Sequence, residues 1–450
     1  MKRLIFLPLS ALFALALFGF FVWLSVPVGV AAGVCAVPGT HPTIQAAVFD
    51  TGCTTINVAA GTFGETVSIT RSVTIIGAGL TNTFVDGGAG GPIFYVSPGL
   101  SVTLESLTIQ NGLHVEGTGL YNEGSHLRLF DTRFLDNVAT SDGGGLYNLG
   151  GQVTILNSEF LTNTAFHGGG IYNTGVITVE QTLFQGNSAV NQTFTMGAGG
   201  GFYSIGSGRV ERSMFVHNHA FATGGGVYND GNLVVLQTSV NENFTQSGTG
   251  SGGGISNDDG LIVISSAIIG NNSVDGGGII NFGSMALIND TIGGNAGNGG
   301  GGLQNRNLAT ISYSTFSNNL ALAGGGILML GGTLNLNSSI VALSLNGGDC
   351  FISSGSLVSQ DYNLDSDGTC NLTQPNDLPS TIPLFGTLGD NGGWTETQAL
   401  LPGSPGIDGG DSATCPPGDQ RGFPRPIGSA CDMGAYEAGW VVYLPVVLKP

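Results

Sequence analysis

Apolar and polar positions alternate along the middle of the chain, and the alternation returns at a regular spacing. The phrase from Gly168 to Asn187 reads GGGIYN, then GVITVE, then QTLFQGN, and holds three strand-sized stretches. Alternation with period two predicts β-strands that bury one face. Three glycines per phrase argue against helices, because each would destabilise a helix by about 1 kcal/mol relative to alanine. The pattern therefore predicts short strands joined by glycine-rich corners.

The phrase recurs every 24 to 31 residues, which indicates a repeat architecture. The glycine-rich openings begin at Gly117, Gly143, Gly168, Gly199, Gly224, Gly252, Gly276, Gly300 and Gly324. An asparagine follows at one position of eight copies: Asn137, Asn163, Asn187, Asn218, Asn243, Asn271, Asn295 and Asn319. The ninth copy has Leu343 there. Length varies almost only between this asparagine and the next opening, so that corner is predicted to be a tolerant surface loop.

Neighbouring strands lie about 4.8 Å apart, so each repeat can form one coil stacked on the next. We predict an all-β fold, a single-stranded parallel β-helix that is right-handed by the crossover rule. The recurring asparagine should form a buried ladder and take the left-handed conformation at its bend. His41 to Phe49 should form a short N-terminal capping helix with Pro42 in its first turn. An irregular C-terminal cap should close the other end.

Five segments follow from this pattern. They are a signal peptide (1–32), an N-terminal cap with the first coils (33–116), regular β-helix repeats (117–345), an irregular C-terminal region (346–437) and an apolar tail (438–450). Lys2 and Arg3 precede a long apolar run that ends in Val30-Ala31-Ala32, which suits cleavage after Ala32. An uncleaved membrane anchor is the alternative. Either outcome predicts an extracytoplasmic protein, secreted or associated with the cell surface.

Two stretches resemble known bacterial families. The pairing of GGG-(I/L/V/F) with FxxN, from Gly117 to about Leu345, resembles the repeat of polymorphic outer-membrane proteins within the pectin-lyase-like superfamily. The region between Asp349 and Glu437 resembles the ending of choice-of-anchor secreted proteins. The resemblance rests on three stretches: LFGTLGDNGGWTETQALLPGSPGIDGGD, DQRGFPRP and CDMGAYE. The first resemblance implies a pectin-lyase-like β-helix. The second implies an extracytoplasmic location without an activity.

Charge and cysteine content restrict the partners and the compartment. Only 9% of the 450 residues are charged and the net charge is −19, so the chain lacks the basic stripe that nucleic acid requires. Membrane contact is expected only through the leader or the tail. The six cysteines suit an oxidising compartment. Proximity in sequence predicts three disulfides: Cys35 with Cys53, Cys350 with Cys370, and Cys415 with Cys431.

Two groups of residues are candidates for binding. Asp230 and Asp258 occupy the same position in adjacent repeats, with Asp259 beside them. The pair could hold calcium, do acid/base work on a glycosidic bond, or be solvated turn residues. No other cofactor is expected. The tolerant corner carries Phe166, His167, Phe194, Phe221 and Phe244, whose rings could stack along an extracellular or cell-wall polysaccharide or fold back as core.

Three functions remain compatible with the sequence. The first is a non-enzymatic surface protein, adhesin-like or polysaccharide-binding, and no catalytic residues are assigned. The second is a polysaccharide lyase or glycoside hydrolase, which needs convergent acid, base or metal residues. The third is a structural spacer. Whether the chain is an enzyme stays open, with the non-enzymatic interpretation preferred.

Overall fold

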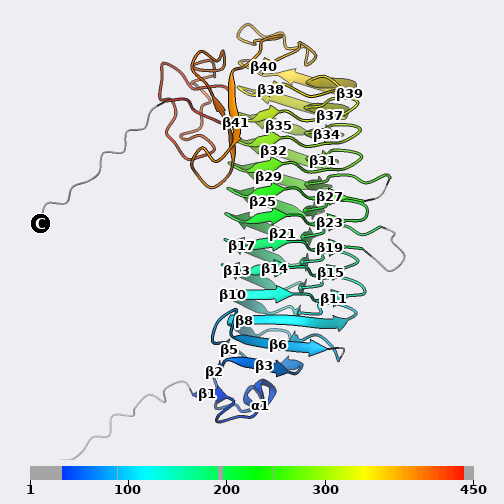
Figure 1. The fold of residues 1–450 in the computed structure, drawn as a ribbon, viewed down its shortest axis with the longest axis vertical. Coiled ribbons are helices and arrows are strands. Elements are labelled where there is room, and N and C mark those ends of the chain that lie inside the picture. Colours follow the sequence, from blue (N-terminus) through cyan, green and yellow to red (C-terminus); the bar gives the residue numbers. More distant parts are fainter. Residues whose placement is uncertain (1–32, 89, 191–195, 247, 440–450) are drawn as a thin grey trace, which may run out of the picture.

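The chain forms an all-β parallel solenoid that rises coil by coil from its N-terminal end (Figure 1). The computed structural model describes residues 33–88, 90–190, 196–246 and 248–439. The predicted leader, Phe194 and nearly all of the apolar tail lie outside these residues. Within the described residues, no helix is long and apolar enough to cross a membrane.

Each coil contributes strands to three faces, as the sequence predicts. Face 1 holds β4 (Val67–Ile69), β7 (Phe94–Val96), β9 (Leu120–Glu123), β12 (Leu146–Leu149), β16 (Ile171–Asn173), β20 (Phe202–Ser204), β24 (Val227–Asn229), β28 (Ile255–Asn257), β31 (Ile279–Asn281) and β34 (Leu303–Asn305). Face 2 holds β1 (Val34–Val37), β2 (Thr55–Val58), β5 (Val73–Ile76), β13 (Gln152–Leu156), β17 (Val176–Glu180), β21 (Ser207–Glu211), β25 (Asn232–Leu236), β29 (Gly260–Ile264), β32 (Ser284–Ile288) and β35 (Ala309–Ser312).

Face 3 follows the second corner. It holds β3 (Gly61–Gly64), β6 (Thr83–Gly88), β14 (Glu159–Leu161), β18 (Leu183–Gln185), β22 (Met214–Val216), β26 (Ser239–Asn241), β30 (Ala267–Ile269), β33 (Thr291–Gly293), β36 (Thr315–Ser317), β38 (Ile340–Ala342) and β40 (Leu364–Asp365). Four longer strands turn from one face to the next: β8 (Ser101–His114), β10 (His126–Leu135), β37 (Ile327–Asn337) and β39 (Cys350–Ser359). A short fourth sheet holds β11 (Val138–Ala139), β15 (Thr164–Ala165), β19 (Ser188–Ala189), β23 (His219–Ala220) and β27 (Phe244–Thr245).

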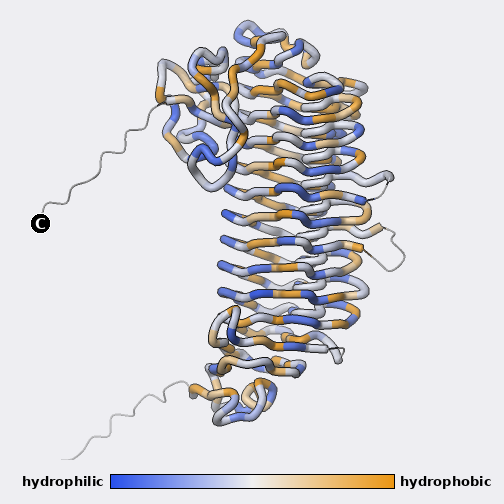
Figure 2. Tube along the Cα trace, viewed as in Figure 1, coloured by the Kyte–Doolittle hydropathy of each residue, from blue (hydrophilic) through white to orange (hydrophobic). Residues whose placement is uncertain are grey.

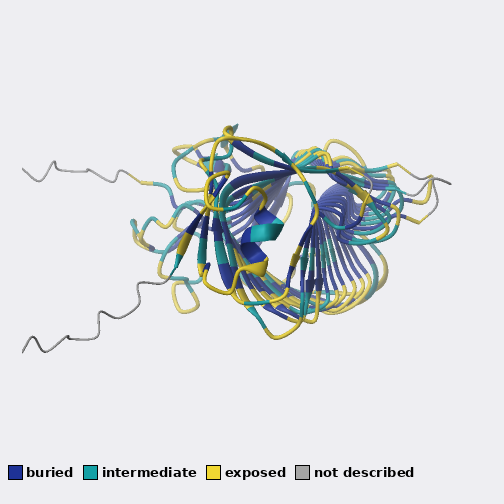
Figure 3. Ribbon diagram, turned by 90° about the horizontal axis from the view of Figure 1, so that it is seen from below, coloured by how far each residue is buried: buried dark blue, intermediate teal, exposed yellow. Residues whose placement is uncertain are grey.

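Equivalent residues of successive repeats lie directly over one another. Ile171, Tyr172 and Asn173 pair in register with Leu146, Tyr147 and Asn148 of the coil before. Apolar residues recur in every coil (Figure 2), and buried residues line the interior of the solenoid (Figure 3). Inside, the rings of Phe134, Phe160, Phe184 and Phe215 stack with centroids 4.4–5.0 Å apart. The core is therefore a set of columns parallel to the axis.

The three glycines of an opening have two different roles. The first, such as Gly143 with φ +67°, adopts the left-handed conformation that the corner needs. The second and third allow close approach of the next coil: a Cβ on Gly144 would lie 2.5 Å from the carbonyl oxygen of Gly169. The glycines therefore bend the chain and permit adjacent coils to stack.

The predicted asparagine ladder is present and fully buried. From Asn137 to Asn319, each Nδ2 donates to the Oδ1 of the asparagine in the next coil at 2.9–3.1 Å. Each Oδ1 after the first rung also accepts a backbone N–H of the preceding rung. The prediction that these asparagines adopt the left-handed conformation is wrong. The preceding residue takes it, as at His217 (φ 54°), which leaves the asparagine side chain pointing into the coil.

The other two corners carry polar ladders that we did not predict. Between faces 1 and 2, Asn122, Asn148 and Asn173 bond in series at 2.7–2.8 Å, and Asn229, Asn257, Asn281 and Asn305 continue beyond Ser204. Between faces 2 and 3, a side-chain oxygen accepts the backbone N–H of the equivalent residue one coil earlier at 2.8–3.2 Å, along Thr182, Ser213, Thr238, Ser266, Asp290, Ser314, Ser339 and Asn363. Each corner therefore satisfies its buried backbone through stacked side chains.

The ninth repeat is one residue out of step with the sequence alignment. Val341, and not Ile340, pairs with Phe316, because β37 contains one additional residue between its two pairings. Ser344 consequently occupies the position assigned to Leu343, which instead takes the left-handed conformation (φ 57°) before it.

The N-terminal cap is a single short helix, α1 (Ile44–Phe49), that lies across the open end of the first coils (Figure 3). It begins later than predicted, because Thr43 is the N-cap and accepts from Ala46 N–H at 3.0 Å, so Pro42 precedes the helix. The Glu65 carboxylate accepts two N–H groups of its first turn at 2.9 Å. The Arg71 guanidinium donates to carbonyls of its last turn at 2.7–3.1 Å. Both ends of the helix are thus satisfied by the coil below.

The C-terminal region has two parts, whereas we predicted one cap. Residues 346–380 close the end of the core, where β39 pairs with β37 and Leu372 joins the buried cluster. Residues 381–438, here called the flank lobe, pack along face 3 beside the upper coils (Figure 1). The flank lobe contains the antiparallel pair β41 (Phe385–Gly389) and β42 (Thr397–Leu400).

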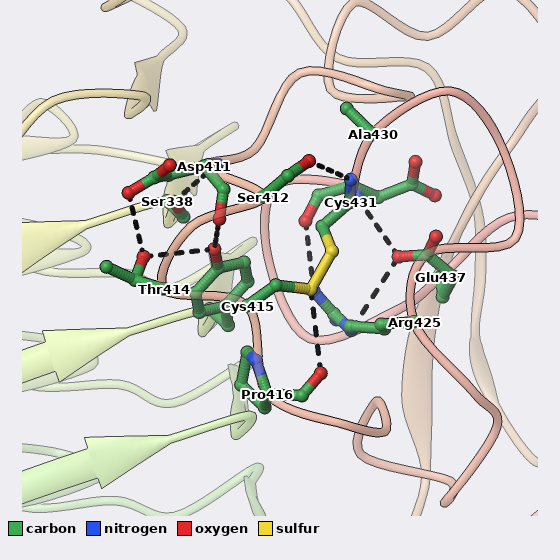
Figure 4. The surroundings of a disulfide bond; sticks show 12 residues. Ser338, Asp411, Ser412, Thr414, Cys415, Pro416, Arg425, Ala430, Cys431 and Glu437 are labelled. Atoms are coloured by element: carbon green, nitrogen blue, oxygen red, sulfur yellow. Dashed lines mark hydrogen bonds and ion pairs between the residues drawn. A yellow bond between two sulfur atoms is a disulfide. The ribbon is translucent and has the colours of Figure 1, made fainter.

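A buried ion pair and a disulfide hold the flank lobe together (Figure 4). The Arg425 guanidinium donates to the carbonyls of Asp432 and Gly434 at 3.0 and 2.6 Å and lies 3.7 Å from the Glu437 carboxylate. The Glu437 carboxylate also accepts the N–H of Asp432 at 3.0 Å. The residues of DQRGFPRP and CDMGAYE therefore have internal structural partners. All three predicted disulfides are confirmed: Cys35–Cys53, Cys350–Cys370 and Cys415–Cys431.

Replacing Asn218 by leucine should lower the free energy of unfolding by about 1–3 kcal/mol, because it leaves the buried Asn187 N–H without its acceptor and removes the side-chain bond to the Phe184 carbonyl. Chemical denaturation followed by circular dichroism measures the loss. Gln185→Leu makes a similar change on the exposed side of the preceding coil and should cost less than about 0.5 kcal/mol. Equal losses would contradict the assignment of inside and outside.

Replacing Asp290 by asparagine should change how stability depends on pH. Burial raises the pKa of Asp290 well above its usual value, so the folded state keeps a proton that the unfolded state releases. The wild-type free energy of unfolding should therefore fall as pH rises from about 4 toward neutrality. Asp290→Asn should lose this part of the slope, which denaturation at a series of pH values tests. Parallel curves for the two proteins would contradict the prediction.

Candidate functional site: the tyrosine column

A continuous column of tyrosines runs along the outside of face 1. Its members come from six successive coils: Tyr95 (β7), Tyr121 (β9), Tyr147 (β12), Tyr172 (β16), Tyr203 (β20) and Tyr228 (β24). In each strand the residues on either side of the tyrosine point inward, as Ile171 and Asn173 do around Tyr172, so the tyrosine must point outward. Neighbouring rings stack with centroids 4.5–5.7 Å apart and interplanar angles of 8–25°. The column stops where Ser256 replaces the tyrosine in β28.

Because the tyrosine rings stack on one another, only part of each side chain is accessible. The ring faces cover one another, and the side chains are mostly half-buried. The accessible parts are therefore ring edges and hydroxyl groups, spaced at about the distance between coils. Such a row can exchange hydrogen bonds with an extended, hydroxyl-rich ligand more readily than it can stack on flat sugar faces.

Carboxylates flank the column on both sides. The Tyr228 hydroxyl donates to Asp258 Oδ2 at 2.8 Å, and the Tyr95 hydroxyl donates to Glu123. On the other side, Asp142 Oδ1 lies 2.8 Å from His167 Nδ1. Burial, with added repulsion from nearby carboxylates, raises the pKa of Tyr147, Tyr203 and Tyr228. The column is therefore rich in hydrogen-bond acceptors and carries negative charge.

Asp258 is the carboxyl group of this rim whose pKa shifts upward. Partial burial raises the pKa of Asp258, the hydrogen bond from Tyr228 lowers it, and the charge of Asp230 in the preceding coil raises it again. Asp258 N–H donates to the Asn229 carbonyl at 2.7 Å, which fixes the turn beside Asp230. The predicted neighbours in adjacent coils are therefore brought together at the end of the column.

The aromatic residues of the tolerant corner do not form the single stack that the sequence suggested. Phe166 and His167 pack together, with ring centroids 4.0 Å apart, and His167 lies 5.1 Å from the ring of Tyr203. Phe166 and Phe221 share one position of the register, but Val190 occupies the coil between them. Phe244 lies two positions earlier in its coil and stacks on His219 at 4.6 Å. His167 therefore packs beside the tyrosine column and Phe166 packs on His167, whereas Phe244 belongs to the short sheet.

Calcium binding at Asp230, Asp258 and Asp259 stays a prediction. Within the described chain, two groups of three or more His, Cys, Asp or Glu side chains come within 4.8 Å of one another, and neither includes these residues. One group contains the Cys35–Cys53 disulfide, whose sulfur atoms are already bonded. The other is Asp349, Asp365 and Asp367 at the C-terminal end of the coils. The oxygens of these three accept backbone N–H groups, including those of Ser366, Cys370 and Thr369, so local turns account for them.

Sequence reasoning missed the tyrosine column although its signal was present. Four glycine-rich openings continue as an apolar residue and Tyr-Asn: GLYN, GGGLYN, GGGIYN and GGGVYN, with GGGFYS a close variant. The fixed offset from the first glycine predicts one outward position repeated in every coil.

Comparisons with known proteins give likenesses in fold. The sequence matches neither a protein-family model nor a curated protein. Among solved structures, the chain is similar to the pectate lyase Pel9A, with 16% identity over 91% of this chain and 98% of that one and a TM-score of 0.40. It is also similar to the catalytic domain of a GH87 α-1,3-glucanase in complex with tetrasaccharides, with 12% identity over 74% and 69% of the two chains and a TM-score of 0.37.

The phenol groups of the column should ionise at a higher pH than free tyrosine, whose pKa is about 10. Alkaline difference absorbance measures this, with circular dichroism to confirm that the fold persists. Asp258→Asn should lower the pH at which one phenol, Tyr228, ionises, because it removes the charged acceptor of its hydroxyl. Asp259→Asn is the matched control, because Asp259 forms no such bond in the structure. Ionisation of all phenols near pH 10 in the folded protein would contradict the column.

Proposed function

We propose that this protein is an exported, non-enzymatic surface solenoid that binds an extended polysaccharide along the tyrosine column. The observation that carries the proposal is the in-register row of six tyrosines whose hydroxyl edges face outward between flanking carboxylates. A row of equivalent groups parallel to the axis suits a ligand that is itself a repeating chain. The signal-like leader and the three disulfides support export to an oxidising compartment.

The charge of the column favours an uncharged polysaccharide over an acidic one. Glu123, Asp142 and Asp258 line its edges, and the chain as a whole carries −19. Arg133, in one of the same coils, lies on face 3 and pairs there with Glu159 at 2.6 Å. A polyanion such as polygalacturonate would meet repulsion along the whole row, whereas sugar hydroxyls can donate to the carboxylates.

Glycoside hydrolysis is the second candidate function, and Asp230 with Asp258 favours it. Two carboxyl groups in adjacent coils, one with a raised pKa, are the minimum that acid/base cleavage of a glycosidic bond requires. Asp258 would act as the acid and Asp230 as the base or nucleophile. They lie at the end of the column, where a bound chain would pass over them.

A triple variant in which Tyr147, Tyr172 and Tyr203 are changed to phenylalanine lacks three hydroxyl groups of the column. It should bind a soluble neutral polysaccharide about tenfold or more weakly than the wild type. Three lost hydrogen bonds of roughly 0.5–1.5 kcal/mol each predict this size. The rings still stack, so stability should change little. Affinity electrophoresis in gels that contain hydroxyethylcellulose, laminarin or polygalacturonate measures binding, and the acidic polymer should retard the protein least.

The matched controls are Tyr362→Phe and Tyr436→Phe, which remove the same group away from the column. If no polysaccharide retards the wild type, or if the triple variant binds as the wild type does, the column is structural and the spacer function is favoured. Release of reducing ends from a neutral polysaccharide, abolished by Asp258→Asn, would replace the binding function by hydrolysis.

A further inference from the structure

A second concave site lies where the flank lobe meets face 3. Met214 of β22 and Ser239 of β26 form one wall, and residues 390–396 of the lobe form the other. The cavity has a volume of about 380 Å³. This is near the lower end of the range for small-molecule pockets, about 300–1,000 Å³, and suits one or two sugar units.

The outward side chains of face 3 explain why the cavity forms at this coil. In the coils that the lobe covers, these side chains are mostly small and buried, as Thr291, Gly293 and Ser317 are. In β22, which the lobe does not cover, the equivalent position is Met214, with 44% of its surface exposed. The lobe therefore ends between β22 and β26. Its loop 390–396 lies beside the exposed Met214 and forms the other wall of the cavity.

Loop 390–396 presents Trp394, which is 55% exposed. Gly393 before it has φ +89°, and a Cβ there would lie 2.7 Å from Arg421 Cα, so this turn is specific to glycine. Thr395 after it donates to the Ser265 carbonyl at 3.2 Å and accepts from Gln420 at 2.8 Å. The Arg212 guanidinium lies 5.4 Å from the centre of the Trp394 ring. A large indole is thus held at the mouth of the cavity by anchored neighbours.

The charged lining is acidic. Glu242, Asp390 and Glu396 line the cavity, and Glu242 pairs with His217 at 2.5 Å. Arg212 is committed to Glu180 and Glu211 at 2.6 and 3.0 Å. Among the ion pairs of the described residues, none involves Asp390 or Glu396. A ligand that complements the cavity needs an apolar face for the indole and positive charge for these two carboxylates.

We propose that this cavity is a binding site for an amine-bearing sugar unit, a hexosamine. The pyranose C–H face would pack on Trp394 and Met214, and the ammonium would lie toward Asp390 and Glu396. An ammonium also gains from the π-face of an indole. The proposal is independent of the tyrosine column, because the cavity lies on face 3 and the column on face 1.

Fluorescence of Trp394 reports on the site directly. The chain has three tryptophans, so Trp23→Phe with Trp440→Phe leaves Trp394 as the single fluorophore. Titration with glucosamine at neutral pH should change its emission, and N-acetylglucosamine, which lacks the charge, should bind about tenfold or more weakly. Glucuronic acid should give no saturable change. Asp390→Asn with Glu396→Gln in the same background should weaken glucosamine binding about tenfold, while the unfolding temperature stays within a few degrees.

Glu105→Gln, a carboxylate change in a distant coil, is the matched control and should leave the titration unchanged. Equal affinity for glucosamine and N-acetylglucosamine would overturn recognition of the ammonium. Equally tight binding of Nα-acetyl-lysine methylamide, which has a free side-chain ammonium, would overturn recognition of a sugar. The site would then bind any ammonium group. No saturable change with any probe would overturn the site. The triple tyrosine-to-phenylalanine variant should titrate as the wild type does, which separates this test from that of the column.

Discussion

Buried hydrogen-bonding groups at the corners are the constraint on which the rest of the solenoid depends. A strand within a face satisfies its backbone through the coils above and below, but a corner must interrupt that pattern inside a dry core. At two corners a side-chain oxygen accepts the backbone N–H of the equivalent residue one coil earlier, as Asn243 Oδ1 does from Asn218 and Asp290 Oδ1 from Ser266. At the third corner an asparagine amide donates both to a turn carbonyl and to the asparagine of the next coil, as Asn148 does. One residue type at one offset therefore repeats from coil to coil. The glycines of the openings follow, because the coils must approach closely enough for these bonds to form.

The same register creates the outer surface. Since Asn173 must point inward to join its ladder, Tyr172 beside it must point outward, and every coil with that pattern adds a tyrosine to the column. The constraint that stabilises the core thus also produces a long row of identical groups outside it. Selection for a ligand can change that row without touching the core, as Ser256 in place of tyrosine illustrates.

The flank lobe shows how motif residues can be mainly structural. Arg425, Glu437 and Asp419 are buried and bond within the lobe, so the wording DQRGFPRP and CDMGAYE reflects how the lobe is assembled. Gln420 links this network to Thr291 of face 3 and to Thr395 beside Trp394. The exposed Trp394 lies at the edge of the lobe, where it meets Met214 of an uncovered coil.

The sequence by itself determined the repeat, the solenoid, the buried asparagine ladder and the three disulfides. Each of these depends on local spacing, which a one-dimensional pattern records. Only the tertiary structure decided which residue bends at each corner and that the ninth repeat slips by one residue around β37. It further decided that His167 packs beside the tyrosines while Phe244 stacks on His219. It also decided where the flank lobe packs, because its contacts join Gln420 to Thr291 and Thr395 to Ser265 across more than a hundred residues. Such pairings follow from complementary shape and hydrogen bonding between distant surfaces, and no spacing within the sequence encodes them.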